Sequence, residues 1–443
     1  MRKIFLTLTL GLALLAPPVA ATALDPRALI ERAVELVESG NYSLARVYLE
    51  PALIDHRLSP GERSRAYYIR GYSFFAAGLY ASAAKDYHNA LEFNPGNPIV
   101  LAAAAQLHLE GLGVDRNPEL AVDLFRQAAE AGLADGKLRL GLLYLKGIGV
   151  EQNLDEARRW LGEAADGGST IAMLQMAQSW RKPWADPPDP AKALEWFERA
   201  HAAGEADALA YAGFMYEEGE SGAPDPAAAR KSFETAAEAG SALAQAKLAH
   251  MHLIGEGAEP DAAKALALFR AAAEQGYPPG FMGLAYLYEA GEGVRADPGE
   301  AMAWYAKAAE AGMVDAQLRM AYAALRKETV EGALEAAEWL ARAAAQRSAR
   351  AMNDYAWLLA TSEHAAVRDG PRAVTLARDA VEQERTPSYL DTLAAAYAEV
   401  GLFEQAVATQ KEALAAAAPD AKPLIEELET HLAAFETGKP WRE

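Results

Sequence analysis

A serine and a lysine on one short segment have the spacing of a known catalytic pair. Ser82 precedes Lys85 by three positions, as in penicillin-recognising enzymes, where the lysine belongs to the machinery around a serine nucleophile. Such enzymes also carry an S-D-N and a K-T-G motif, and the sequence contains neither. We therefore expect Ser82 and Lys85 to be ordinary surface residues.

The sequence offers no pattern for a metal or a phosphate. His250 and His252 are two positions apart, which on a helix separates their directions by about 200°. The chain has no cysteine and no H-E-x-x-H segment. Its G-x-G-V turns follow expected helices, whereas phosphate-binding glycine turns follow strands. Adjacent carboxylates such as Glu426 and Glu427 are expected to lie on solvated faces. We predict no metal, no cofactor and no enzymatic activity.

One segment has the residue types of a protein-binding surface. Trp180, Arg181, Lys182 and Trp184 lie together, and tryptophan and arginine are enriched where binding energy concentrates. Trp180 could instead pack in the core, and Trp184 could cover a loop. Tyr68 is a fifth candidate, because it belongs to an aromatic cluster that is otherwise expected in the core. We predict partner contacts at these five residues and keep the packing alternative open.

The elements that would position these residues recur every 36 residues. Six segments align without a gap from Asn97 to Gly312, and a seventh, more divergent copy runs to Ser348. They end in similar sequences, such as Q-A-A-E-A-G and K-A-A-E-A-G. Most also contain a glycine-rich turn near the middle, such as K-G-I-G-V. A period of this length indicates a repeat fold in which each copy buries its apolar face against the next.

Each copy is predicted to form two helices. In the copy at 277–312 the first helix ends at Gly291, because glycine adopts the left-handed cap conformation without strain. Asp297 and Pro298 begin the second helix, since aspartate caps free N–H groups and proline suits the first turn. Gly312 ends that helix. One large side chain recurs in the second helices: Phe125, Leu161, Phe197, Phe233, Phe269 and Tyr305.

The pattern A-x2-Y/F, then G-x-G-V, then D-x2-A-x2-W-Y/F-x2-A-A-x2-G resembles the Sel1-like repeat, a relative of the tetratricopeptide repeat. The resemblance covers Asn97 to about Ser348. Two copies depart from it, because W-R-K-P-W at 180–184 and R-K-E-T-V at 326–330 replace the glycine loop. Both flanks are similar to tetratricopeptide repeats. The clear copies are 66–95 and 387–419, and the looser ones are 27–53 and 349–382.

We therefore predict an all-α fold, a right-handed α-solenoid of about eleven helix pairs. Its parts are tetratricopeptide-like repeats at 24–96, seven Sel1-like repeats at 97–348 and further tetratricopeptide-like repeats at 349–419. A capping helix from Lys422 to Phe435 lies within the closing part, 420–443, with Leu424, Ile425, Leu428 and Leu432 on one side.

Residues 1–23 have the pattern of a cleavable export signal. Arg2 and Lys3 precede an apolar stretch that is too short to span a membrane, and a small-x-small site ends near Ala23. No later segment is long and apolar enough for a membrane span, and no cysteine is available for a lipid anchor. We expect a soluble protein in the periplasm or secreted from the cell.

The charge and the resemblance together indicate protein partners. The net charge of −20 disfavours nucleic acid and anionic lipid. The resemblance implies a non-catalytic scaffold or adaptor that binds partner segments in its groove. Exported members of the family serve in exopolysaccharide secretion, as regulators of envelope sensor kinases, or in contacts with hosts. Some cysteine-rich members carry a β-lactamase label, so a β-lactamase-like or cell-wall hydrolase is the alternative from another class.

Overall fold

The computed structural model describes residues 25–182, 184–185, 187–256 and 259–443, and these residues form α-helices and loops with no strand. The predicted all-α fold is confirmed. The chain divides into two compact units, Met1–Ala208 and Leu209–Glu443. The predicted signal peptide, 1–23, lies outside the described residues.

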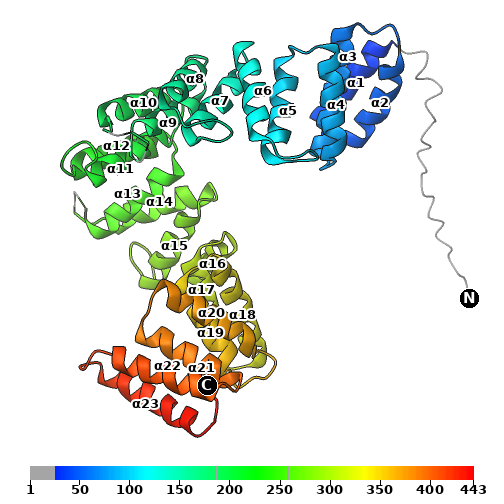
Figure 1. The fold of residues 1–443 in the computed structure, drawn as a ribbon. Helices are drawn as coiled ribbons and strands as arrows, with labels where there is room; N and C mark the ends of the chain where they lie inside the picture. Colours follow the sequence, from blue (N-terminus) through cyan, green and yellow to red (C-terminus); the bar gives the residue numbers. More distant parts are fainter. Residues whose placement is uncertain (1–24, 183, 186, 257–258) are drawn as a thin grey trace, which may run out of the picture. The chain divides into compact units, whose positions relative to one another are not determined.

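In the first unit the helices pack side by side as five consecutive pairs (Figure 1). The first two pairs correspond to the predicted tetratricopeptide-like copies, and the next three to Sel1-like copies. The helices are α1 (Pro26–Glu38), α2 (Tyr42–Ile54), α3 (Pro60–Ala76), α4 (Tyr80–Phe93), α5 (Pro98–Glu110), α6 (Pro118–Glu130), α7 (Ala134–Lys146), α8 (Leu154–Asp166), α9 (Thr170–Ser179) and α10 (Pro190–Ala202).

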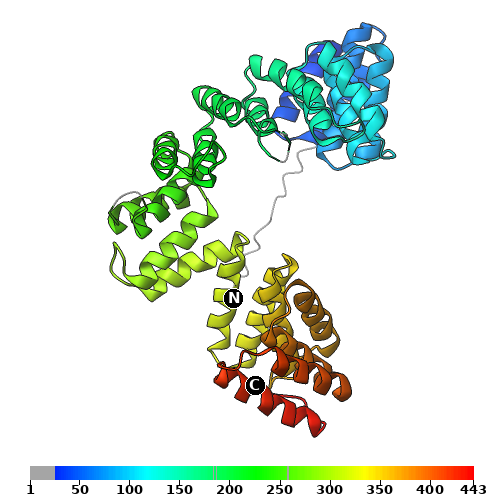
Figure 2. The ribbon, with the colours of Figure 1, turned by 60° about the vertical axis from the view of Figure 1, so that its left-hand side comes forward.

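The described part of the second unit continues the pattern with six pairs and a closing helix (Figure 2). The helices are α11 (Ala208–Glu218), α12 (Pro226–Glu238), α13 (Ala242–Ile254), α14 (Ala262–Glu274), α15 (Pro278–Ala290), α16 (Pro298–Glu310), α17 (Val314–Leu325), α18 (Val330–Ala345), α19 (Ala349–Thr361), α20 (Gly370–Gln383), α21 (Pro387–Glu399), α22 (Phe403–Ala416) and α23 (Lys422–Glu436). The eleven predicted pairs are all present.

The second helices of the Sel1-like copies begin at cap residues equivalent to the predicted Asp297. The Asn117 side chain accepts a hydrogen bond of 2.9 Å from the Leu120 N–H, and Asp225 accepts one of 3.0 Å from the Ala228 N–H. A proline follows each cap residue in the first helical turn. These bonds satisfy N–H groups that have no partner within the helix, which fixes where each second helix starts.

One large side chain per copy fills the space between the paired helices. The predicted series is buried throughout, with no member more than 5% exposed: Phe125, Leu161, Phe197, Phe233, Phe269 and Tyr305. The facing first helix makes room for it. A Cβ atom on Gly213 would lie 2.7 Å from the Phe233 ring, so a small residue opposite a large one lets the two helices approach closely.

The glycine loops connect each copy to the one before it. Gly147 ends α7 in the left-handed conformation, with φ +67°. Gly149, two residues later, has φ +69°, and a Cβ there would lie 2.3 Å from the Pro118 carbonyl oxygen at the start of α6. The loop therefore packs on the N-terminus of the preceding second helix. This contact confirms that the G-x-G-V turns are structural.

We expect Gly149→Ala to lower the free energy of unfolding of the first unit by about 2–4 kcal/mol, since it adds backbone strain and a clash with Pro118. Gly132→Ala is the matched control, because Gly132 has φ +93° but open space around its Cβ position. Strain alone should cost about 1–2 kcal/mol there. Urea denaturation of both variants tests this, and equal losses would contradict the packing role of the loop.

The two divergent copies form their loops differently. In the third copy α9 ends early at Ser179, and Trp180 caps it in a right-handed conformation instead of a left-handed glycine. In the seventh copy the turn between α17 and α18 places Glu328 at φ +52°. A non-glycine residue in this region costs about 1–2 kcal/mol, so Glu328 maintains a strained turn.

The closing helix α23 covers the last pair with a partly different face from the predicted one. Leu428 is fully buried as expected, but Ile425 and Leu432 are only half-buried. His431 and Phe435 occupy the buried stripe in their place. Among the described residues, none of the helices combines the length and the apolar character that a membrane crossing requires.

Candidate protein-binding groove

The first helices of the second unit carry one aromatic or imidazole side chain per copy at equivalent positions, and each is at least partly exposed. His250 on α13, Tyr286 on α15 and Tyr322 on α17 are 36 residues apart. Each lines a cavity, and neighbouring cavities share lining residues. Tyr286 belongs to the first two cavities, and Tyr322 belongs to the second and third. We call this continuous surface the groove, and its three parts the apolar, central and acidic cavities.

The apolar cavity has a volume of about 630 Å³ and lies mainly between α13 and α15. Its walls are aliphatic and aromatic, and two of its side chains are strongly exposed, Ile254 at 58% and Tyr286 at 47%. Lys247, which forms an ion pair of 2.9 Å with Glu217, is its one lysine among the described residues. Exposed apolar side chains around a cavity are typical of a surface that a partner covers.

The central cavity, of about 540 Å³, is crossed by an ion-pair network. Glu289 on α15 accepts hydrogen bonds from Arg319 on α17, at 3.0 and 3.1 Å. Glu289 also accepts a hydrogen bond of 2.7 Å from the Tyr305 hydroxyl. Burial and this bond to a carboxylate raise the pKa of Tyr305 to about 12. The network joins two neighbouring copies and carries both signs of charge.

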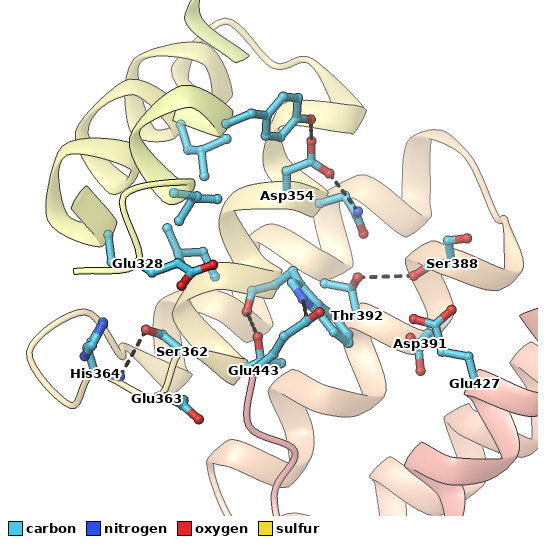
Figure 3. Close-up of a pocket in the computed structure, with 18 of the residues that line it drawn as sticks. Glu328, Asp354, Ser362, Glu363, His364, Ser388, Asp391, Thr392, Glu427 and Glu443 are labelled. Carbon is cyan, nitrogen blue, oxygen red and sulfur yellow. Dashed lines mark hydrogen bonds between the residues drawn. The ribbon is translucent and has the colours of Figure 1, made fainter. Parts of the chain in front are cut away.

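The acidic cavity is the largest, at about 890 Å³, and lies among α17, α19, α21 and α23. Figure 3 shows its labelled carboxylates, which come from several of these elements. Its described lining includes a single basic or imidazole side chain, His364, against six carboxylates: Glu328, Asp354, Glu363, Asp391, Glu427 and Glu443. Such a concentration of one sign attracts a basic group of a partner.

Buried hydrogen bonds hold two of these carboxylates in place. Asp391 is 6% exposed and accepts bonds from the Gln410 amide, at 2.6 Å, and from the His431 ring Nδ1, at 2.8 Å. Asp354 accepts a bond from the Tyr322 hydroxyl. That bond and, first of all, burial raise the pKa of Tyr322 to about 12. Carboxylates that are fixed by such partners present a preorganised charge.

Sequence models identify the repeats that build this arrangement. The model of the Sel1 repeat matches residues 100–133, 134–169, 171–205, 206–241, 242–277 and 281–313. Each match covers one helix pair, from α5–α6 to α15–α16. The chain contains six Sel1 repeats. Copies outside the matched residues, such as α17–α18, continue the same pairing and supply much of the acidic cavity.

Solved structures agree with this assignment. The Sel1 repeat protein is similar to a protective antigen of uropathogenic Escherichia coli that displays a Sel1-like repeat fold, with 25% identity and a TM-score of 0.51, over 94% of this chain and 89% of that one. It is also similar to a Sel1 repeat protein from Oxalobacter formigenes, with 28% identity and a TM-score of 0.53, over 76% and 93%. No curated protein matches the chain in sequence.

The structure places Trp180 among cations of its own chain. Two cations stack on its ring: the Arg158 guanidinium lies 3.4 Å from the ring centroid and the Lys192 ammonium 4.2 Å from it. The Trp180 side chain is partly buried. Its equivalents in other copies of this Sel1 repeat protein are positions such as Tyr216 and Tyr288, which are not among the groove residues described above. These contacts describe a packing role, and a partner contact at Trp180 stays a prediction.

The other predicted binding residues do not meet in one site. Arg181 bonds the Gln178 side chain at 3.3 Å, Lys182 is exposed and Trp184 is half-buried. Tyr68 lies elsewhere in the first unit. It stacks on Tyr87 with ring centroids 6.0 Å apart, and it lines an apolar cavity of about 490 Å³. Their role in binding stays a prediction.

The residues considered for catalysis and metal binding occupy structural positions. Ser82 and Lys85 are both exposed on α4, as expected for surface residues. His250 faces the groove while His252 is 7% exposed, so the two rings point apart as predicted. Within the described residues there is no cluster of three or more histidine, aspartate or glutamate side chains that could hold a metal.

His252 gives the Sel1 repeat protein a testable pH dependence. Burial, and then the Arg230 guanidinium, whose Nη2 lies 3.3 Å from the ring Nε2, lower the pKa of His252 below its ordinary value of 6.5. The unfolded chain therefore binds a proton below about pH 6.5 that the folded chain resists, and stability falls as the pH decreases through this range.

We expect His252→Gln to flatten the pH dependence of unfolding between about pH 6.5 and 5. The slope should decrease by up to one proton, or about 1.4 kcal/mol per pH unit. Urea titrations at several pH values measure it, with His250→Gln, on the exposed side of the same helix, as the control. A slope identical to that of the wild type would show that His252 does not contribute.

The groove was not predicted, because its residues are ordinary in type and only their recurrence at one repeat position distinguishes them. The signal was present: Phe214, His250, Tyr286 and Tyr322 follow one another at the repeat spacing, and all four line groove cavities. A position that carries a large ring in copy after copy and keeps it at least partly exposed indicates a recognition face.

Proposed function

We propose that this Sel1 repeat protein is a non-catalytic scaffold that binds extended segments of other proteins in the groove of its second unit. The observation that carries the proposal is the run of three adjoining cavities along the first helices. Repeat solenoids bind partners along such surfaces, because equivalent positions of successive copies present side chains at regular intervals.

The chemistry of the groove specifies the kind of segment. Exposed Ile254 and Tyr286 at the apolar cavity fit an aliphatic or aromatic anchor of the partner. The carboxylates of the acidic cavity, such as Asp354 and Glu427, fit a lysine or an arginine further along the same segment. The partner is therefore a protein segment with an apolar residue at one end and a basic residue at the other.

The proposal includes export to the periplasm or beyond the cell. It is supported by the signal-like pattern of residues 1–23, and by the similarity to a protein described as a protective antigen. In that compartment the partner would be a component of envelope assembly, of secretion or exopolysaccharide export, or of a sensor system. Identification of the bound protein distinguishes these roles.

Site-specific photocrosslinking in living cells tests the proposal. A photoreactive amino acid replaces Tyr286 in the groove and, as the control, replaces Leu334, which is 42% exposed on the second helix α18. We expect protein adducts at position 286 and few at 334, and we expect Ile254→Asp to reduce the adducts severalfold. Equal labelling at both positions, or none at 286 in a folded protein, would count against the groove.

A further inference from the structure

The tail, residues 437–443, folds back from the end of α23 onto the first helices of the last copies. It forms no helix, and its main chain runs beside the loop after α19. The Glu443 N–H donates to the Thr361 carbonyl oxygen at 2.8 Å, and the Glu363 N–H donates to the Glu443 carbonyl oxygen at 3.2 Å. A short segment of this chain is thus bound in the manner of an extended peptide.

Side chains of the tail occupy specific places in the second unit. The Trp441 ring lies 4.5 Å from the His431 ring, centroid to centroid. The Arg442 guanidinium forms an ion pair of 2.5 Å with Glu399 on α21 and donates to the Ala360 carbonyl oxygen at 3.1 Å. The tail is therefore held by an aromatic contact and a charge-assisted hydrogen bond, the two interactions that most often anchor a peptide.

The Glu443 side chain of the tail lies in a cavity that contains other side chains of the same charge. The Glu443 carboxylate accepts a bond of 2.7 Å from the Trp357 Nε1–H. It thereby enters the acidic cavity, which already contains Asp354 and Glu427. Like charges in one cavity repel one another. A segment with a basic residue at this place would relieve the repulsion and keep the other contacts of the tail.

The tail adds one apolar side chain, Trp441, to the edge of the core of the last copies. The closing helix α23 already covers the last apolar face with Leu428 and Phe435, which are at most 1% exposed. Lys439 and Glu443 are exposed. A segment without regular structure, held by a few contacts, opens more readily than the packed helices below it.

We infer that the tail is an internal ligand of the groove, and that a partner segment with adjacent aromatic and arginine residues followed by a basic residue displaces it. This inference rests on the proposed function and names the partner's chemistry at the acidic end. While the tail is bound it blocks the acidic cavity beside Trp357, so the affinity for a partner depends on release of the tail.

Two synthetic peptides test the inference: the tail sequence T-G-K-P-W-R-E, and the same peptide with the change Glu443→Lys. Their binding is measured by fluorescence anisotropy to the full chain and to a form that lacks residues 437–443. We expect the shortened form to bind the tail peptide. The lysine peptide should bind it about tenfold more tightly, and this advantage should decrease with added salt. The full chain should bind both peptides at least about tenfold more weakly, because a tethered segment competes at an effective concentration in the millimolar range.

A full-length variant tests the inference even if the shortened form does not fold. Trp441→Ala combined with Arg442→Ala removes the two anchors of the tail and leaves α23 intact, and Lys439→Ala is the control in an exposed tail residue. We expect the double variant to bind the lysine peptide like the shortened form, and the control to bind it like the wild type. Helical content by circular dichroism confirms that each form is folded.

The outcomes separate the two proposals. If the folded shortened form binds neither peptide, or binds no better than the full chain, the internal ligand is overturned. The proposed function then survives if Tyr286 crosslinking still yields specific adducts, since that position lies in the apolar cavity. The tail peptide can also bind the shortened form while the lysine peptide binds no more tightly. In that case the tail is a ligand, but the inference that the partner carries a basic residue at this position is wrong.

Discussion

Replacing Asp86 by alanine is expected to lower the free energy of unfolding of the first four helices by about 3–5 kcal/mol. Asp86 lies on α4 with its side chain 3% exposed, and it accepts two hydrogen bonds of 2.7 Å from Arg70 on α3. The substitution leaves the half-buried guanidinium without its carboxylate. Because an unpaired charge in a poorly solvated place is costly, removal of one partner costs more than the pair contributes.

A surface pair of the same type provides the control. Arg65 and Glu31 are 2.5 Å apart in the same unit, but their side chains are 50% and 59% exposed. Glu31→Ala should cost less than about 1 kcal/mol, because solvent screens an exposed pair. Urea denaturation and hydrogen exchange of α3 and α4 give the comparison. The double change Arg70→Met and Asp86→Leu should restore most of the loss, and equal costs at Asp86 and Glu31 would refute the argument.

The fold could be predicted from the sequence because its signals are local and repeated. The cap at Asn117, the left-handed turn at Gly147 and the buried ring of Phe233 each follow from a few neighbouring residues. The stacking of one copy on the next then follows from the repeat itself, since no single pair can bury its apolar face alone. The closing helix was predicted for the same reason, although of its predicted apolar face only Leu428 is fully buried.

The acidic cavity could not be predicted in the same way, because it depends on residues far apart in the sequence. The acidic cavity joins Glu328 to Glu427 and Glu443. Glu427 is exposed as expected, but exposure on a flat surface and exposure at a cavity look alike in sequence. Contacts of the tail with Trp357 and Glu399 also join residues that are 86 and 43 positions apart, and no periodic signal predicts them.

At 180–184 the residue types indicate a binding surface, whereas the contacts of Trp180 indicate packing. Trp180 has the composition of a binding hot spot, yet the structure surrounds it with Arg158 and Lys192 of its own chain. Two cations stacked on one indole stabilise a loop that lacks the usual glycine. The groove residues are instead ordinary tyrosines and carboxylates, and their repeat position and the cavity in front of them indicate recognition.

Phe233 is the fully buried large residue of the pair α11–α12, and it also supports a residue of the groove. Its ring packs edge to face against Phe214, with centroids 5.1 Å apart, and Phe214 lines the apolar cavity. We expect Phe233→Ala to lower the free energy of unfolding of the second unit by about 3–5 kcal/mol, because it removes an aromatic side chain and leaves a cavity. Loss of the supporting ring should also loosen Phe214 and weaken binding at the groove.

Phe233→Leu is the matched control, because the equivalent position of another copy carries the fully buried Leu161. Since leucine fills much of the space, the loss should be only about 1–2 kcal/mol. Urea denaturation measures both variants, and crosslinking at Tyr286 in each variant reports on the groove. A stability loss from Phe233→Ala no larger than that from Phe233→Leu would mean that the copy collapses around the smaller side chain. In that case the large recurring residue does not set the spacing of the helices that build the groove.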